Sequence, residues 1–232
     1  MDNVTTINGV NNIYVGCVDA ILPALIEGRR VVVITDANID RLYGDLVHRF
    51  DYIIIGHGEA NKNLLTVQNI YRELMALGAD RSTLLLGIGG GIVTDITGFV
   101  ASTYMRGLNF GFVSTTLLGQ VDASLGGKNG VNLDGYKNMV GTFNQPQFVI
   151  CDPTLLDTLP EREFRAGLAE IIKAGIIADS NLFERIERSS FEELRGDHKL
   201  LGEIILAAIK VKAEIVGRDE RESGERRKLN LG

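Results

Sequence analysis

Short apolar runs alternate with helical patterns along the first two thirds of this 232-residue chain, and this alternation constrains the fold most. Five continuous runs, apolar or β-branched, lie at residues 31–35, 52–55, 83–86, 110–114 and 148–151. Such runs are typical of strands that are buried on both faces. Helical patterns occur between them, at 64–75 and 92–104. The fold class predicted is α/β, with a doubly wound, mostly parallel sheet whose strands are joined by crossover helices.

The pattern changes near Pro153 and Pro160. No further strand is predicted beyond them. Residues 161–177 form one helical pattern, and residues 201–215 form another with a single apolar stripe. We therefore predict two domains: an α/β domain over residues 1–158 and a helical domain over residues 159–232.

Composition and charge exclude several classes of function. The net charge of −6 argues against a nucleic-acid-binding surface. No apolar run approaches the roughly 18 residues of a membrane helix, and the N-terminus lacks the pattern of a secretory signal. Two cysteines are too few for a disulfide framework and favour free thiols in a reducing compartment. We expect a cytoplasmic protein that binds neither nucleic acid nor membranes. The histidines His48, His57 and His198 show no metal-like spacing.

The strongest local motif is the glycine-rich run GIGGGIVTD at residues 87–95, which follows a predicted strand and opens a predicted helix. Glycines there let backbone N–H groups and the helix N-terminus approach a phosphate. The run does not match G-x-G-x-x-G, because Ile92 or Thr94 falls at the last position, and no Gly-Lys-Ser/Thr follows it. Phosphate binding and a simple tight turn therefore both remain open.

Polar residues at other strand ends are equally ambiguous on their own. Asp36, with Asn38 close behind, suits either a ribose diol or a helix N-cap. Glu59 and Lys62 suit either a mutual ion pair on a solvated turn or a ligand contact. Thr115 and Thr116 follow the strand predicted at residues 110–114, and hydroxyls at this end of a strand commonly meet ligands.

Charged residues in glycine-rich or apolar surroundings form the last group. Lys128 lies among glycines, and Lys137 follows nine residues later; each suits an anion contact or a solvated side chain. Glu170 and Lys173 share one helix face at i, i+3, which suits an intrahelical ion pair or a metal or functional role. The charged run at 217–228 is interpreted as a solvated loop.

Taken together, these motifs resemble the 3-dehydroquinate synthase family over essentially the whole chain. The resemblance is carried by Gly89-Gly90-Gly91…Asp95, by Ser114–Leu118 with Val121–Ser124 and Gly126–Lys128, by Lys137-Asn138, by Asp152-Pro153…Thr158-Leu159-Pro160…Glu163, and by Ala169–Lys173. The residues 226–232 are similar to the segment that, in the family, leads into a zinc-binding histidine.

The resemblance implies an NAD-binding α/β domain followed by a helical domain, usually in a homodimer. It implies a lyase of the shikimate pathway, which serves aromatic amino acid biosynthesis. The substrate is a small phosphorylated keto acid, 3-deoxy-D-arabino-heptulosonate 7-phosphate, which becomes 3-dehydroquinate and phosphate. NAD takes a hydride and returns it. A divalent metal, zinc or cobalt, polarises the hydroxyl that is oxidised.

The family's functional residues map onto this sequence position by position. The positions similar to cofactor contacts are Asp36, Asn38, Glu59, Lys62, Gly90, Gly91, Ile92, Asp95, Thr115, Thr116, Lys128, Lys137 and Thr158. The positions similar to the catalytic substrate shell are Arg106, Asp122, Lys128, Lys137, Asn138, Lys173, Lys212, Arg226 and Asn230. Glu170 resembles the carboxylate metal ligand. The resemblance also implies that six of the basic side chains converge on one pocket, namely Arg106, Lys128, Lys137, Lys173, Lys212 and Arg226.

One departure limits the resemblance. The family places its zinc-ligand histidines beyond residue 232, and one carboxylate does not make a catalytic zinc site, which takes about three protein ligands. The expectation is a chain truncated at its C-terminus that, as it stands, lacks synthase activity or has only a trace of it. Three other hypotheses stay open: a related sugar-phosphate cyclase, a metal-dependent polyol dehydrogenase, and a non-catalytic NAD-binding fragment.

Overall fold

The computed structural model describes residues 3–7, 11–219, 222 and 224–231. A seven-stranded sheet runs in the order β1-β2-β9-β6-β5-β3-β4, and all pairs are parallel except β1 with β2. The strands are β1 Asn3–Ile7, β2 Asn11–Val15, β3 Val31–Asp36, β4 Asp51–Ile55, β5 Leu84–Gly89, β6 Asn109–Ser114 and β9 Phe148–Cys151. The predicted doubly wound α/β fold class is confirmed.

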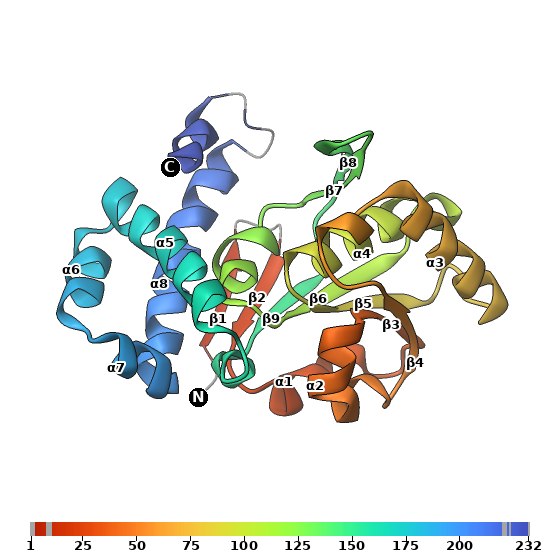
Figure 1. The fold of residues 1–232 in the computed structure, drawn as a ribbon, viewed down its shortest axis with the longest axis horizontal. Helices are drawn as coiled ribbons and strands as arrows, with labels where there is room; N and C mark the ends of the chain where they lie inside the picture. Colours follow the sequence, from red (N-terminus) through yellow and green to blue (C-terminus); the bar gives the residue numbers. More distant parts are fainter. Residues whose placement is uncertain (1–2, 8–10, 220–221, 223, 232) are drawn as a thin grey trace.

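Helices cover both faces of this sheet (Figure 1). The helices of this region are α1 Val18–Ile26, α2 Ala37–Val47, α3 Leu64–Ala76 and α4 Gly91–Thr103. Because successive strand residues point to opposite faces, Val32 and Ile34 join the core beneath α3 and α4, whereas Val31 and Val33 join the core beneath α1 and α2. This two-sided burial explains the continuous apolar runs in the sequence.

The strand β4 departs from the prediction of two-sided burial. Tyr52 is 41% exposed and Ile54 is 40% exposed, whereas Ile53 and Ile55 are buried. The reason is topological, because β4 pairs only with β3 and ends the sheet. An edge position cannot be distinguished from a central one by an apolar run of four residues.

A second, two-stranded sheet was not predicted. It is the hairpin of β7 Lys128–Leu133 and β8 Tyr136–Phe143, which stands away from the large sheet on the same side as the C-terminal segment (Figure 1). Its base packs on α4, where a Cβ at Gly98 would lie 1.8 Å from Oδ1 of Asn129. Glycine at position 98 therefore lets the buried Asn129 approach the helix and fix the base of the hairpin.

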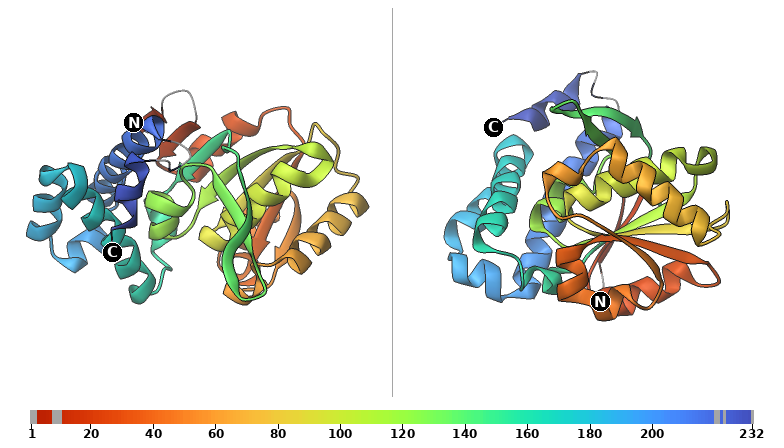
Figure 2. Two further views of the ribbon diagram at one scale, coloured as in Figure 1. Left: turned by 90° about the horizontal axis from the view of Figure 1, so that it is seen from above. Right: turned by 45° about the vertical axis from the view of Figure 1, so that its right-hand side comes forward.

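The described residues after Pro160 are mostly helical, and both views of Figure 2 show these helices beside the sheet. The helices are α5 Glu161–Ala178, α6 Ser180–Arg188, α7 Phe191–Gly196 and α8 His198–Arg218. Leu168 of α5 and Ile204 of α8 belong to the same hydrophobic core as Val93 of α4, so the two regions pack as neighbours. The boundary at residue 158 stays a prediction. Within the described residues, no helix has the length and apolar character needed to cross a membrane.

Candidate functional site

The carboxyl ends of the parallel strands meet at one edge of the large sheet. Asp36 ends β3, Gly89 ends β5 and Ser114 ends β6, and these strands are neighbours in the sheet. Crevices at this edge of an open α/β sheet are where such folds bind ligands. Many of the residues singled out by sequence therefore lie on, or directly after, this edge.

The glycine-rich turn joins β5 to α4. A Cβ at Gly90 would lie 2.8 Å from Cγ2 of Thr116, and one at Gly91 would lie 3.0 Å from Cβ of Ala123. Glycines are therefore needed for the turn to pack against the chain that follows β6. Gly90 is the N-cap of α4 and makes no side-chain capping hydrogen bond, so the N-terminal N–H groups of α4 suit an anion.

Hydroxyl groups lie near this turn. Thr115 is buried, and its Oγ1 has no hydrogen-bond partner among the described residues, which is costly unless a ligand or water supplies one. Oγ1 of Thr116 accepts a hydrogen bond from the N–H of Gly119 at 3.0 Å. Further along the edge, Oγ1 of Thr158 lies 2.7 Å from the hydroxyl of Tyr43.

Asp36 acts as a helix cap in the structure. Its Oδ1 accepts hydrogen bonds from the N–H groups of Asn38 and Ile39, at 2.8 and 3.0 Å, which caps α2. The other oxygen, Oδ2, lies 3.7 Å from Nδ1 of His57. The capping role and a ligand role are compatible, because only one oxygen is used for the cap.

Glu59 and Lys62 do not pair with each other. Lys62 is 6% exposed and forms an ion pair with Asp95, and its Nζ also donates to Oδ1 of Asn138 at 2.6 Å. Burial raises the pKa of Asp95 to about 6, against the lowering effect of Lys62. Nearby Glu59 adds to this rise. A buried ammonium thus joins the loop after β4, the helix α4 and the hairpin.

A cleft of about 380 Å³ lies beside Asp95. Eight residues that the sequence singled out line it: Asp95, Asp122, Lys128, Asn138, Lys173, Lys212, Arg226 and Asn230. Four of its lining side chains are basic and three, counting Glu222, are acidic, so the cleft is slightly positive in a chain of net charge −6. A second hollow of about 440 Å³, between α4 and the hairpin, shares Asp95, Lys128 and Asn138 with it.

Asp122 and Lys212 form an ion pair in this cleft. Asp122 lies in a π-helical turn, Gly119–Ala123, and Lys212 of α8 contacts its carboxylate and donates to its backbone carbonyl at 2.7 Å. Burial alone would raise the pKa of Asp122, but Lys212, Lys173 and Arg226 together hold it below the ordinary value. The carboxylate therefore stays ionised at neutral pH and fixes the ammonium of Lys212.

The interpretation of residues 217–228 as a solvated loop is wrong for Arg226. It is 4% exposed, and its guanidinium donates two hydrogen bonds of 3.2 Å to the carbonyl of Gly126. A Cβ at Gly126, where φ is +86°, would lie 2.5 Å from the guanidinium, so glycine gives the arginine room. The neighbouring Arg227 and Lys228 are exposed as expected.

Glu170 and Lys173 form the intrahelical ion pair that was one of the two interpretations. Glu170 has no companions for a metal site, since no three His, Cys, Asp or Glu side chains of the described residues are placed so that they could hold a metal ion together. The donor set of the described chain therefore does not fit a catalytic divalent metal, which needs about three protein ligands.

Two residues of the predicted substrate shell lie outside the cleft lining, and two unpredicted residues stand out. Arg106 follows the far end of α4 from the glycine turn, and Lys137 is exposed on β8. Glu222, from the charged run, contacts Lys128 and accepts from Asn230 at 2.5 Å. Asn132 of β7 contacts the Glu59 loop. Nothing in the local sequence distinguishes Glu222 or Asn132 from solvated polar residues.

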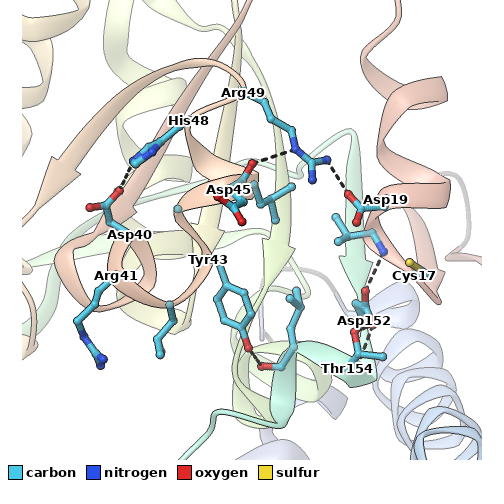
Figure 3. Close-up of a pocket in the computed structure, with 15 residues that line it drawn as sticks. Cys17, Asp19, Asp40, Arg41, Tyr43, Asp45, His48, Arg49, Asp152 and Thr154 are labelled. Atoms are coloured by element: carbon cyan, nitrogen blue, oxygen red, sulfur yellow. Dashed lines mark hydrogen bonds and ion pairs between the residues drawn. The ribbon is translucent and has the colours of Figure 1, made fainter.

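A larger cavity of about 530 Å³ lies between α1, α2 and the chain after β9, and none of the cleft residues lines it. Figure 3 shows Arg49 directed toward Asp19 and His48 directed toward Asp40. Arg49 binds Asp19 at 2.6 Å, and His48 binds Asp40 at 2.7 Å. Asp152 accepts from the N–H of Val18 at 2.8 Å. These contacts between lining residues explain the polar character of the cavity wall.

Comparison with known proteins places the chain. A model of the 3-dehydroquinate synthase N-terminal region matches residues 52–166, and one of the C-terminal region matches residues 167–232. A 3-dehydroquinate synthase of Natranaerobius thermophilus is 42% identical over all of this chain and 68% of its own length. The chain belongs to the 3-dehydroquinate synthase family. A synthase of Koribacter versatilis is 44% identical over 89% of this chain, which spans 58% of that relative.

Solved structures agree with membership of the 3-dehydroquinate synthase family. The 2-epi-5-epi-valiolone synthase of Streptomyces hygroscopicus, with NAD+ and Zn2+ bound, matches with a TM-score of 0.85 at 29% identity, over 98% of this chain and 67% of that one. A 2-deoxy-scyllo-inosose synthase complexed with carbaglucose-6-phosphate, NAD+ and Co2+ matches with a TM-score of 0.86 at 25% identity, over 99% and 67%. An iron-containing alcohol dehydrogenase, at 13% identity and a TM-score of 0.69, shares the fold alone.

Proposed function

We propose that this chain supplies the NAD-binding and substrate-binding residues of a 3-dehydroquinate synthase, which converts 3-deoxy-D-arabino-heptulosonate 7-phosphate to 3-dehydroquinate and phosphate. The observation that carries the proposal is the cleft in which Lys128, Lys173, Lys212 and Arg226 meet beside the glycine turn. A sugar acid with a phosphate and a carboxylate needs such a concentration of positive charge. Family membership and 42–44% identity to curated synthases support this choice of substrate.

NAD fits the residues present at the sheet edge. The uncapped N-terminus of α4 and the Gly90–Gly91 turn suit its pyrophosphate, and the unsatisfied hydroxyl of Thr115 suits a polar atom of the ligand. Asp36, with one carboxylate oxygen outside the cap, suits a ribose. When bound, NAD supplies a hydride acceptor that is regenerated in the same reaction.

The chain's own residues bind and orient the substrate. The four basic side chains neutralise its phosphate and carboxylate, and Asp122 holds the ammonium of Lys212 in place. The amides of Asn138 and Asn230 in the same cleft suit hydroxyl groups of the sugar. A catalytic metal takes about three protein ligands, and the described residues offer only Glu170 toward one.

The finer assignments follow from the same proposal. The cofactor set and the substrate shell inferred from the resemblance, the division near residue 158, a cytoplasmic location and a homodimer are all proposed on this basis. Arg106, beyond the far end of α4, is retained in the substrate shell on the resemblance alone.

Calorimetry on the 232-residue chain tests the proposal. NAD+ is titrated first, followed by 3-deoxy-D-arabino-heptulosonate 7-phosphate or by carbaglucose-6-phosphate, which carries a phosphate but no carboxylate. We expect the keto acid to bind about tenfold more tightly or better, because a second anionic group pairs with cations. Equal or reversed affinities contradict the proposed substrate and favour a related cyclase.

Two further outcomes separate the other hypotheses. Net accumulation of NADH during incubation of the chain with substrate and NAD+ favours a polyol dehydrogenase, since a synthase returns its hydride. Binding of NAD+ without binding of any sugar phosphate favours a non-catalytic NAD-binding module.

A further inference from the structure

The hairpin β7–β8 is irregular at one place, close to the cleft. Val131 faces Val140, and Leu133 faces Tyr136, so Asn132 alone stands opposite the three residues 137–139 of β8. Bulges of this kind bend a strand and re-aim a side chain, and they are frequent beside functional sites. The middle residue of this bulge is Asn138, whose φ is +52°, in the left-handed region.

Asn132 makes three hydrogen bonds at this bulge. Its side-chain Oδ1 accepts from the N–H of Asn138 at 2.9 Å, and its Nδ2 donates to Oε1 of Glu59 at 2.9 Å. Its backbone N–H donates to the carbonyl of Lys62 at 2.8 Å. The orientation of the amide is fixed by chemistry, because a backbone N–H can only donate and a carboxylate can only accept.

These bonds close a ring with the buried ammonium described above. Asn138, held by Asn132, offers its Oδ1 to Nζ of Lys62 at 2.6 Å, and Lys62 also pairs with Asp95. A two-stranded hairpin has little stability of its own, so its anchors decide where its side chains lie. The base is anchored through Asn129, and the bulge is anchored through Asn132.

We propose that Asn132 is a positioning residue whose side-chain amide holds the bulge open, aims Asn138 at Lys62 and the cleft, and ties the hairpin to the Glu59 loop. The inference rests on the proposed function, which assigns this loop to NAD and this hairpin to the substrate. Asn132 acts through Glu59 and Asn138 rather than by touching either ligand.

The test compares two variants of the 232-residue chain. Asn132→Ala removes both side-chain bonds. Asn132→Asp keeps an acceptor for the N–H of Asn138 but places a carboxylate against that of Glu59. The control is Asn69→Asp, which adds the same charge on the exposed surface of α3. The readouts are hydrogen exchange of the Asn138 amide by NMR without ligand, and the affinity for NAD+ by calorimetry.

We expect Asn132→Ala to speed hydrogen exchange of the Asn138 amide about tenfold and to weaken the binding of NAD+ several-fold, because both side-chain hydrogen bonds are lost. Asn132→Asp should leave that exchange rate within about twofold of the parent while weakening the binding of NAD+ by about tenfold or more. Asn69→Asp should change neither. General destabilisation cannot produce this split between the two readouts.

The inference is overturned if Asn132→Asp speeds exchange as much as Asn132→Ala, or if Asn132→Ala changes neither readout. If Asn132→Ala does not fold, the pattern of Asn132→Asp alone decides. Failure of the parent chain to bind NAD+ refutes the proposed function instead, and the exchange data still test the anchoring of the bulge.

Discussion

The partly buried carboxyl of Asp95 gives a quantitative prediction for stability against pH. Burial raises its pKa in the folded chain from 3.8 to about 6, even though Lys62 pairs with it and opposes the rise. A folded-state pKa above the unfolded value means that the folded chain holds this proton more tightly. The associated stability is fully present below pH 3.8 and is lost as pH rises through about 6.

The size of the effect follows from the same values. The difference between 3.8 and about 6 corresponds to about 3 kcal/mol of unfolding free energy. Asp95→Asn removes the titrating group. The change in unfolding free energy that the substitution itself causes therefore does not depend on this ionisation. The unfolding free energy of the parent minus that of the variant should therefore fall by about 3 kcal/mol between pH 3.8 and 7, and stay level above.

Urea unfolding followed by circular dichroism at several pH values measures this difference. Lys62→Met provides a second check, because removal of the ammonium that opposes burial should move the step to higher pH. A difference that does not change with pH, or one that grows as pH rises, refutes the reasoning. The latter would mean that Lys62 outweighs burial and that the pKa of Asp95 lies below its ordinary value.

Two further predictions concern the glycine turn and the cleft. Gly90→Ala places a Cβ 2.8 Å from Cγ2 of Thr116. It should therefore lower the unfolding free energy measured in urea by about 1–3 kcal/mol and weaken the binding of NAD+ measured by calorimetry. Gly196→Ala, whose Cβ would have open space around it, should leave the unfolding free energy within about 0.5 kcal/mol of the parent. Equal losses of stability in the two variants would contradict the role of the turn. Arg226→Ala should weaken the binding of inorganic phosphate about tenfold or more in calorimetry, whereas Arg227→Ala, at an exposed position, should not. Similar effects of both substitutions would show that Arg226 is not part of the site.

The sequence predicts the parallel sheet well because its central strands are buried on both faces. A run such as Val31–Thr35, short and rich in β-branched residues, is typical of a strand that is buried on both faces. The hairpin β7–β8 escaped prediction because most of β8 is exposed and its residues carry no strict alternation of apolar and polar side chains. Its position depends on Asn129 meeting Gly98, a contact between segments that are far apart in the sequence.

The chemistry of individual side chains was harder to predict than the fold. Lys62 and Glu59 are close in sequence, yet each binds a different distant partner, Asp95 and Asn132. Arg226 is buried because Gly126, 100 residues away, leaves it room. Motifs carried by one segment, such as the glycine turn, can be seen in a sequence, whereas burial of a charge depends on the tertiary partner.

The most direct test of the account is a crystal structure of the 232-residue chain grown with NAD+ and inorganic phosphate. We predict the pyrophosphate of NAD+ against the Gly90–Gly91 turn, and a phosphate ion among Lys128, Lys212 and Arg226 in the cleft beside it. An empty glycine turn, or NAD+ bound in the cavity between α1 and α2 instead, would contradict the account.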